Sequence, residues 1–322
     1  MIKALIVGFC LLLISHKSYC WGFFGHQKIN YFSVFLLPPE MMVLYKPNIQ
    51  FLTDHSVDPD KRRYAVASEA PKHFIDIDLY GAYPYPKLPR RYDSASKIFS
   101  EETIISNGIV PWWIEIMEAR LTKAFEEKNQ PKILKLSAEI GHYIADCHVP
   151  LHANSNHDGQ LTNQKGIHAF WESRVPELLA EKDFDFMIGK AAYIDNTNRY
   201  IWQRVLESGA AADTVLREEA MLTKSFPADR KFAFEERNGK LIRQYSSEFT
   251  RAYDKILKGM VERRMRLAIS SVASFWYTAW VNAGQPDLKN MQKVAFSDAD
   301  IKEFEYLDLM WKTTVAKGRV DD

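Results

Sequence analysis

The stretch LKLSAEIGHYIADCHVPLH (residues 134–152) combines a strong helical pattern with a concentration of potential metal ligands. Its apolar residues recur at the spacing of one helix face. His142 and Asp146 are four residues apart, so both side chains lie on the same face of that helix. Pro150 should disturb the helix and leave His152 free to point elsewhere. Imidazole and carboxylate groups suit zinc, so the stretch predicts a helix that carries part of a metal site.

Further pairs of potential ligands occur elsewhere in the chain. In HAFWE, His168 and Glu172 again stand four residues apart. Asp58 and His73 flank a stretch that ends in EAPKHFID, and His26 follows the first apolar segment. One such pair is more often an ion pair or a buried hydrogen bond, but three pairs in one chain favour a metal centre.

Other metal-binding patterns are weaker. Glu139 and His142 form a Glu-x-x-His motif, but di-iron bundles need two copies and the sequence holds one. The chain has no His-Glu-x-x-His motif, so the sequence does not support a zinc protease of that type. His55 and His157 lie near the ligand pairs and are expected at the surface.

Residues 1–20 have the pattern of a secretory signal peptide. A basic residue precedes an apolar run that is too short to span a bilayer. Ser18 and Cys20 are small residues in the positions that favour cleavage before Trp21. Lipidation of Cys20 is the alternative, although the residues before it fit a lipobox poorly. The pattern predicts an exported protein, periplasmic or extracellular.

The charge balance and the cysteine content narrow the class of protein. Basic and acidic residues number 42 and 41, so no global field attracts nucleic acid or an anionic membrane. Cleavage removes Cys10 and Cys20 and leaves Cys147 as a single thiol. An exported chain with one thiol has no internal disulfide, so another device must stabilise it.

The chain from residue 21 to residue 322 is predicted to be one all-α multi-helix domain. No repeat, low-complexity segment or Gly/Ser linker divides it. The uncharged window 267–281 is too short to cross a membrane, so we expect a buried core helix and no transmembrane segment. Irregular loops are expected at 54–63, 80–93 and 154–165, and helices at 22 to about 37, 111–128, 134–147, 166–179, 193–206 and 240–282.

Trp21 has a particular chemistry if cleavage makes it the first residue. A free α-amino group has a pKa of about 7.7–8.0, so a metal ion displaces its proton readily. The amine nitrogen and the carbonyl oxygen of one residue close a five-membered chelate. His26 lies about one helical turn further on and would reach the same ion.

The motifs WGFFGH, HFIDID, HYIADCHVPLH and HAFWE, in this order, resemble the superfamily of zinc-dependent phospholipases C and single-strand-specific zinc nucleases of the mung bean type. The stretch SFWYTAWVNAGQPDL resembles bacterial members more loosely. The resemblance spans residues 21–172 and implies an all-α domain around three zinc ions. It implies that Asp58, His73, His142 and Asp146 hold one ion, that Trp21, His26 and Asp146 hold the second, and that His152, His168 and Glu172 hold the third.

The resemblance also implies a chemistry. Two close zinc ions activate a water for attack on a phosphodiester, and the third neutralises the phosphate. Asp58 is the family's candidate for orienting or deprotonating that water. The nucleases place an arginine three residues after this aspartate, and here that position holds Lys61, followed by Arg62 and Arg63. Lysine does not clamp phosphate in a bidentate way, which sets Lys61 apart from the nuclease pattern.

The motifs divide between two substrate classes. His148 and the Trp-Gly-x-x-Gly-His opening resemble the nucleases. Glu172 and the short interval between His152 and His168 resemble the phospholipases. The predicted substrate is therefore a phosphodiester, either a phospholipid head group or a single-stranded nucleic acid. An exported zinc-binding protein without turnover is the alternative, and the sequence indicates no stable protein partner.

Overall fold

A computed structural model describes residues 22–237, 239–291 and 294–319. The predicted signal peptide and Trp21 lie outside these residues. The described part is mostly helical, which confirms the predicted all-α class. Its α-helices are α1 (Gly22–Val34), α2 (Pro39–Tyr45), α3 (Ile49–Asp54), α4 (Asp58–Ala65), α5 (Tyr92–Ala95), α6 (Glu101–Ser106), α7 (Val110–Glu126), α8 (Gln130–Asp146), α9 (Ile167–Ala169), α10 (Val175–Asp183), α11 (Thr197–Ser225), α12 (Ser247–Ile256), α13 (Met260–Asn282) and α14 (Asp298–Thr313).

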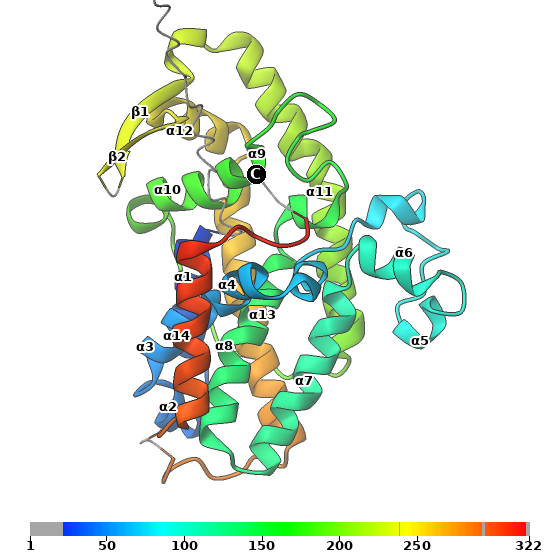
Figure 1. Ribbon diagram of the computed structural model, residues 1–322, viewed down its shortest axis with the longest axis vertical. Helices are drawn as coiled ribbons and strands as arrows, with labels where there is room; N and C mark the ends of the chain where they lie inside the picture. Colours follow the sequence, from blue (N-terminus) through cyan, green and yellow to red (C-terminus); the bar gives the residue numbers. More distant parts are fainter. Residues whose placement is uncertain (1–21, 238, 292–293, 320–322) are drawn as a thin grey trace, which may run out of the picture.

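Short turns and one hairpin complete the described elements. The 3-10 turns are η1 (His55–Val57), η2 (Ala67–Lys72), η3 (Ile77–Tyr80), η4 (Pro150–Ala153) and η6 (Ala228–Arg230), and η5 (Phe170–Arg174) is π-helical. Strands β1 (Phe232–Arg237) and β2 (Lys240–Tyr245) pair antiparallel, with Phe232 opposite Tyr245. The hairpin lies beside α10 and α12 (Figure 1).

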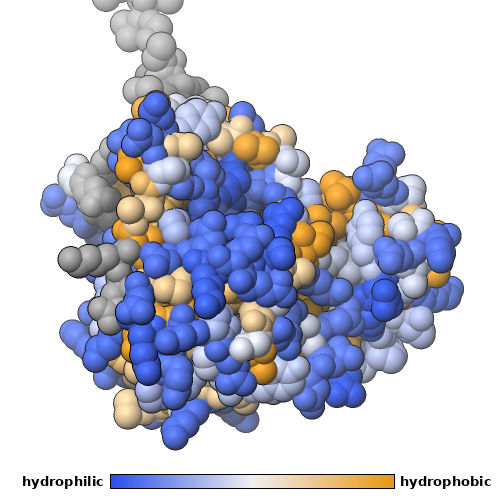
Figure 2. Space-filling view, turned by 90° about the horizontal axis from the view of Figure 1, so that it is seen from below, coloured by the Kyte–Doolittle hydropathy of each residue, from blue (hydrophilic) through white to orange (hydrophobic). Residues whose placement is uncertain are grey.

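Helix α13 forms the centre of the core. It packs against α1, α7 and α8, and Val272, Phe275 and Trp276 are fully buried. This burial confirms the core helix predicted for 267–281, and removing such side chains from water is the main stabilising contribution. Within the described part of the chain, no helix combines the length and apolarity that a membrane crossing requires. The face shown in Figure 2 is mainly hydrophilic, with small separate hydrophobic patches.

The prediction of one helix over 240–282 is wrong. Its first residues form β2, and two separate helices, α12 and α13, follow. Gly239 has φ +72°, so it supplies a left-handed conformation of the kind that a tight hairpin turn needs. Gly259 has φ +69° and separates α12 from α13 in the same way.

The prediction of an irregular loop over 54–63 is also wrong, because η1 and α4 cover most of these residues. Pro59 is the second residue of α4, where a missing backbone N–H breaks no helical hydrogen bond. The helices predicted at 22–37, 111–128 and 134–147 are confirmed as α1, α7 and α8, with shifts at their ends. The helix predicted at 193–206 begins at Thr197 and continues to Ser225, and the one predicted at 166–179 is divided among α9, η5 and α10.

Helices α1 and α8 approach each other closely beside η1 and η5. Gly141 permits this approach, because a Cβ atom at this position would collide with the side chain of Asn30. Asn30 Nδ2 donates to the carbonyl oxygens of Ala138 and Leu52, both at 3.1 Å, so α8 and α3 are tied to α1. One turn before Asn30, His26 of α1 stacks on His142 of α8, so predicted ligands of both helices lie where the two helices meet.

Candidate metal centre

Three groups of buried histidines and carboxylates lie among the described residues. In each group, one donor atom from every member lies within 4.8 Å of the others. The groups are His26, His142 and Asp146; Asp60, His73 and His142; and His152, His168 and Glu172. Because His142 belongs to two groups, the first two form one continuous cluster.

Helix α8 supplies the centre of this cluster. His142 Nε2 lies 3.3 Å from Asp146 Oδ2, as the four-residue spacing predicts. The other ring nitrogen of His142 donates to the carbonyl oxygen of Ser56 at 2.8 Å, because a carbonyl oxygen only accepts. This hydrogen bond leaves the lone pair on Nε2, which faces the carboxylates.

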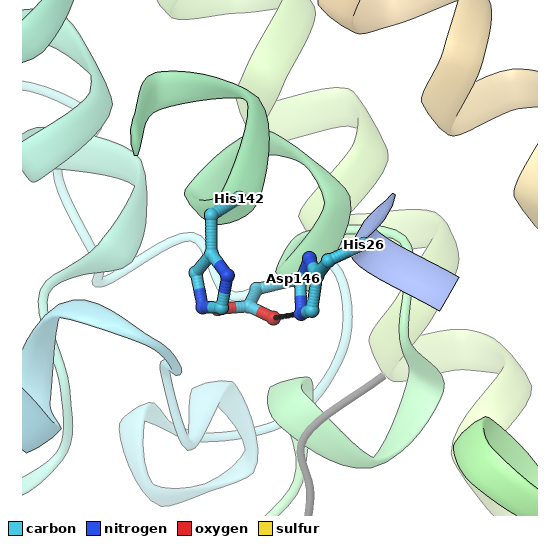
Figure 3. Close-up of side chains that lie close together, drawn as sticks. All are labelled: His26, His142 and Asp146. Carbon is cyan, nitrogen blue, oxygen red and sulfur yellow. Dashed lines mark ion pairs between the residues drawn. The ribbon is translucent and has the colours of Figure 1, made fainter. Parts of the chain in front are cut away.

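His26 enters the cluster from α1. Its Nε2 atom lies 3.5 Å from Asp146 Oδ1. Its ring stacks on that of His142, with a centroid distance of 3.7 Å. Figure 3 shows His26 from α1 and His142 from α8 on the two sides of the Asp146 carboxylate. Asp146 therefore stands between the two histidines and can serve two neighbouring ions.

His73 directly follows η2, and its ring also lies against the Asp146 carboxylate. Its Nδ1 atom lies 3.1 Å from Asp146 Oδ2, and its Nε2 atom lies 3.8 Å from Glu69 Oε1. Glu69 is fully buried and accepts a hydrogen bond from the Tyr143 hydroxyl. The 3.8 Å separation is too long for a hydrogen bond, so Glu69 contributes a nearby negative charge behind the His73 ring.

The aspartate that joins the cluster from α4 is Asp60, which the sequence analysis missed. Asp60 Oδ1 lies 3.6 Å from His142 Nε2 and 3.7 Å from His73 Nδ1. One sequence signal favours it, because Arg63 stands three residues later, the spacing of the nuclease pattern.

Asp58, which was predicted as a ligand, belongs to none of the three groups found among the described residues. Its carboxylate lies 2.6 Å from His55 Nδ1 and 3.1 Å from Lys61 Nζ. Lys61 Nζ also lies 2.7 Å from Asp308 Oδ1 on α14. Both predicted catalytic residues, Asp58 and Lys61, thus take part in ion pairs that link η1, α4 and α14.

The third group forms where η4 and η5 meet. Glu172 Oε2 lies 3.4 Å from His152 Nε2 and 3.1 Å from His168 Nε2. His152 Nδ1 donates to the carbonyl oxygen of His73 at 2.6 Å, and His168 Nδ1 donates to that of His157 at 3.1 Å. Both rings therefore present the lone pair of Nε2 to the Glu172 carboxylate.

The remaining histidines lie outside these groups. His148 is fully buried, and its Nδ1 atom donates to the carbonyl oxygen of Ile144 at 2.8 Å. Its Nε2 atom lies 3.0 Å from Ser271 Oγ on α13. His55 and His157 are half-buried, whereas the sequence analysis expected them at the surface.

Burial controls the protonation of the cluster. It lowers the pKa of His26, His73 and His142, so these imidazoles are neutral at pH 7. Burial also raises the pKa of Asp60 to about 7 against the attraction of His142, and the charge of Asp146 adds to the rise. Neutral imidazoles are the form that binds metal ions.

The donor atoms fit zinc. Considering only the described residues, both ring nitrogens of His26, both carboxylate oxygens of Asp60 and Nε2 of His152 are buried without a hydrogen-bond partner. Buried polar atoms are normally paired, because leaving them unpaired is unfavourable. Bound cations satisfy such atoms, and imidazole nitrogens with carboxylate oxygens are a zinc donor set that needs no thiolate.

Comparison with known proteins gives likenesses among solved structures. No family model matches the sequence, and no curated protein matches it. Among solved structures, an alpha toxin from Clostridium absonum is similar with a TM-score of 0.45 and 13% sequence identity, over 85% of this chain. The likeness covers 66% of the toxin chain.

Proposed function

We propose that the protein is an exported zinc-dependent hydrolase of phosphodiester bonds, related to the zinc-dependent phospholipases C and single-strand-specific zinc nucleases. The observation that carries this proposal is the set of three buried donor groups, two of which share His142. The four motifs that resemble the superfamily supply every member of these groups except Asp60. An isolated ion pair could account for one cluster of histidine and carboxylate side chains. It does not account for three buried clusters of the same kind in one chain.

We assign three zinc ions to this chain. One is held by Asp60, His73, His142 and Asp146, and Asp60 takes the place that the resemblance gave to Asp58. The second is held by His26, Asp146 and the amine and carbonyl of Trp21. The third is held by His152, His168 and Glu172. The orientation of the histidine rings by backbone carbonyl oxygens supports this assignment.

The residues around these ions have separate roles in the proposed reaction. Bound zinc supplies Lewis acidity, which activates a water and neutralises phosphate oxygens. Asp60 accepts the proton of the attacking water at a carboxylate oxygen. Arg63 is buried close enough to the cluster to oppose the rise in the pKa of Asp60, and its planar guanidinium suits a phosphate. Lys61 holds Asp58 and Asp308 together and positions α4.

The substrate remains one of two classes, a phospholipid head group or a single-stranded nucleic acid. The test is a hydrolysis panel on zinc-loaded protein that begins at Trp21, with single-stranded DNA, RNA, phosphatidylcholine and bis(p-nitrophenyl) phosphate. Zinc-free protein and Asp146→Asn are the controls. Cleavage of the chromogenic diester and of one natural class, lost in both controls, supports the proposal. No cleavage of any substrate by protein with full zinc would favour a zinc-binding protein without turnover.

A further inference from the structure

The end of the described chain closes over helix α4. Residues 314–319, called here the C-terminal strap, follow α14 and cross beside α4 (Figure 1). The last carbonyl groups of a helix have no partner within the helix. Here the strap supplies two donors, because Lys317 N reaches Arg63 O at 2.9 Å and Lys317 Nζ reaches Ala65 O at 2.7 Å. A segment about 250 residues away in sequence thus caps the helix that carries Asp60.

The end of the strap holds the side chain of Arg63. Arg63 Nη2 donates to the carbonyl oxygen of Arg319 at 2.5 Å. The Arg319 guanidinium donates to Asp76 Oδ1 at 2.7 Å and lies 3.9 Å above the ring of Phe74. Phe74 directly follows His73, so the strap contacts two of the segments that bring ligands to the first zinc site.

The strap fits its position tightly. Gly318 has φ +88°, a conformation that residues with a side chain rarely adopt. A Cβ atom at Gly318 would lie 2.8 Å from Cβ of Ala70 on η2, closer than ordinary packing allows. Val315, by contrast, is 68% exposed and offers a matched position in the same segment for a control substitution.

We propose that the C-terminal strap is a positioning element of the hydrolase, which holds the Arg63 guanidinium in the orientation that binds a phosphate group. This inference rests on the proposed function and extends it to a part of the chain far from the motifs. The Arg63 side chain has several rotatable bonds. Its hydrogen bond to the Arg319 carbonyl oxygen therefore limits the orientations that the guanidinium adopts. Capping of α4 by the strap fixes the backbone from which Arg63 projects.

The test compares Gly318→Val with Val315→Ser, each in protein that begins at Trp21 and is loaded with zinc. Isothermal titration with inorganic phosphate measures anion binding without turnover, and hydrolysis of bis(p-nitrophenyl) phosphate gives KM and kcat separately. We expect Gly318→Val to keep its zinc, to bind phosphate about tenfold more weakly, which is about 1.4 kcal/mol, and to show a matching rise in KM. Val315→Ser should behave as the unaltered chain. Unchanged phosphate affinity in Gly318→Val would overturn the proposal.

A double-mutant cycle separates positioning from general destabilisation. If the strap acts through Arg63, Gly318→Val should add little to the phosphate-binding loss of Arg63→Ala. Additive losses would contradict the proposal. Arg319→Ala, which removes the contacts to Asp76 and Phe74, serves as the strap variant if Gly318→Val does not fold. Phosphate binding without any hydrolysis would count against the proposed function but not against the role of the strap.

Discussion

Asp60 Oδ1 lies 3.6 Å from His142 Nε2, whereas the carboxylate of Asp58 faces His55 and Lys61. This relationship predicts opposite results for two neighbouring substitutions. Asp60→Asn should lose about one zinc ion per chain, because an amide is a poor zinc ligand. Asp58→Asn should keep its full zinc content. Metal analysis after desalting measures both, and equal zinc loss in the two variants would show that the assignment within α4 is wrong.

The ion pairs of Asp58 predict a pH-dependent stability. Burial alone would raise its pKa, but contacts with His55 and Lys61 outweigh burial and hold the pKa below its usual value. A carboxyl whose pKa is lower in the folded state stabilises above its unfolded pKa of about 3.9 and loses that contribution as the pH falls. Asp58→Asn should therefore reduce the free energy of unfolding of zinc-free protein at pH 7 by about 1–3 kcal/mol. Urea unfolding at several pH values checks this, and a difference that does not shrink below about pH 4 would contradict it.

Asp146 and His148 stand two residues apart and are expected to differ in function. Asp146 faces both His26 and His73, so Asp146→Asn should disturb two ions and abolish hydrolysis. His148 contacts the Ile144 carbonyl and Ser271, so His148→Ala should lower stability and leave zinc content unchanged. Zinc content, hydrolysis rate and thermal unfolding of the two proteins provide the comparison. Similar zinc loss in both would mean that His148 is a ligand or orients one.

If Trp21 binds zinc through its α-amino group, zinc content should depend on whether Trp21 is the first residue of the chain. Trp21 lies outside the described residues, and its role as a ligand through its own amine remains a prediction. One glycine retained before Trp21 turns the amine into an amide, whose nitrogen has no lone pair to offer. The extended protein should fold but lose one zinc and most of its activity, whereas Trp21→Phe with the correct start should keep that zinc. Full zinc in the extended protein would exclude the amine as a ligand.

The sequence predicts the local parts of the candidate site well. The pairs His142–Asp146 and His168–Glu172 approach as expected, because residues four apart on one helix share a face whatever the rest of the fold does. Helix α8 ends at Asp146, before Pro150, and Pro150 begins η4, on which His152 meets Glu172 of the second pair. These features depend on helical periodicity, which a sequence shows directly.

Helical periodicity in the sequence did not show which of Asp58 and Asp60 is the metal ligand. Once residues 58–65 are helical, positions two apart point about 200° away from each other, so only one aspartate faces α8. The sequence pattern predicts an irregular loop over residues 54–63, and a loop offers no helix face on which to place either aspartate. The strap over Arg63 depends on a contact between distant segments, which no local pattern indicates.

The central claim is that bound zinc makes this chain a phosphodiesterase. The most direct measurement follows hydrolysis of bis(p-nitrophenyl) phosphate by zinc-free protein that begins at Trp21, while zinc is added in steps. Three donor groups predict that hydrolysis rises with added zinc and levels off at about three ions per chain. A chain that binds about three zinc ions without hydrolysis, or that hydrolyses the diester without zinc, would contradict the claim.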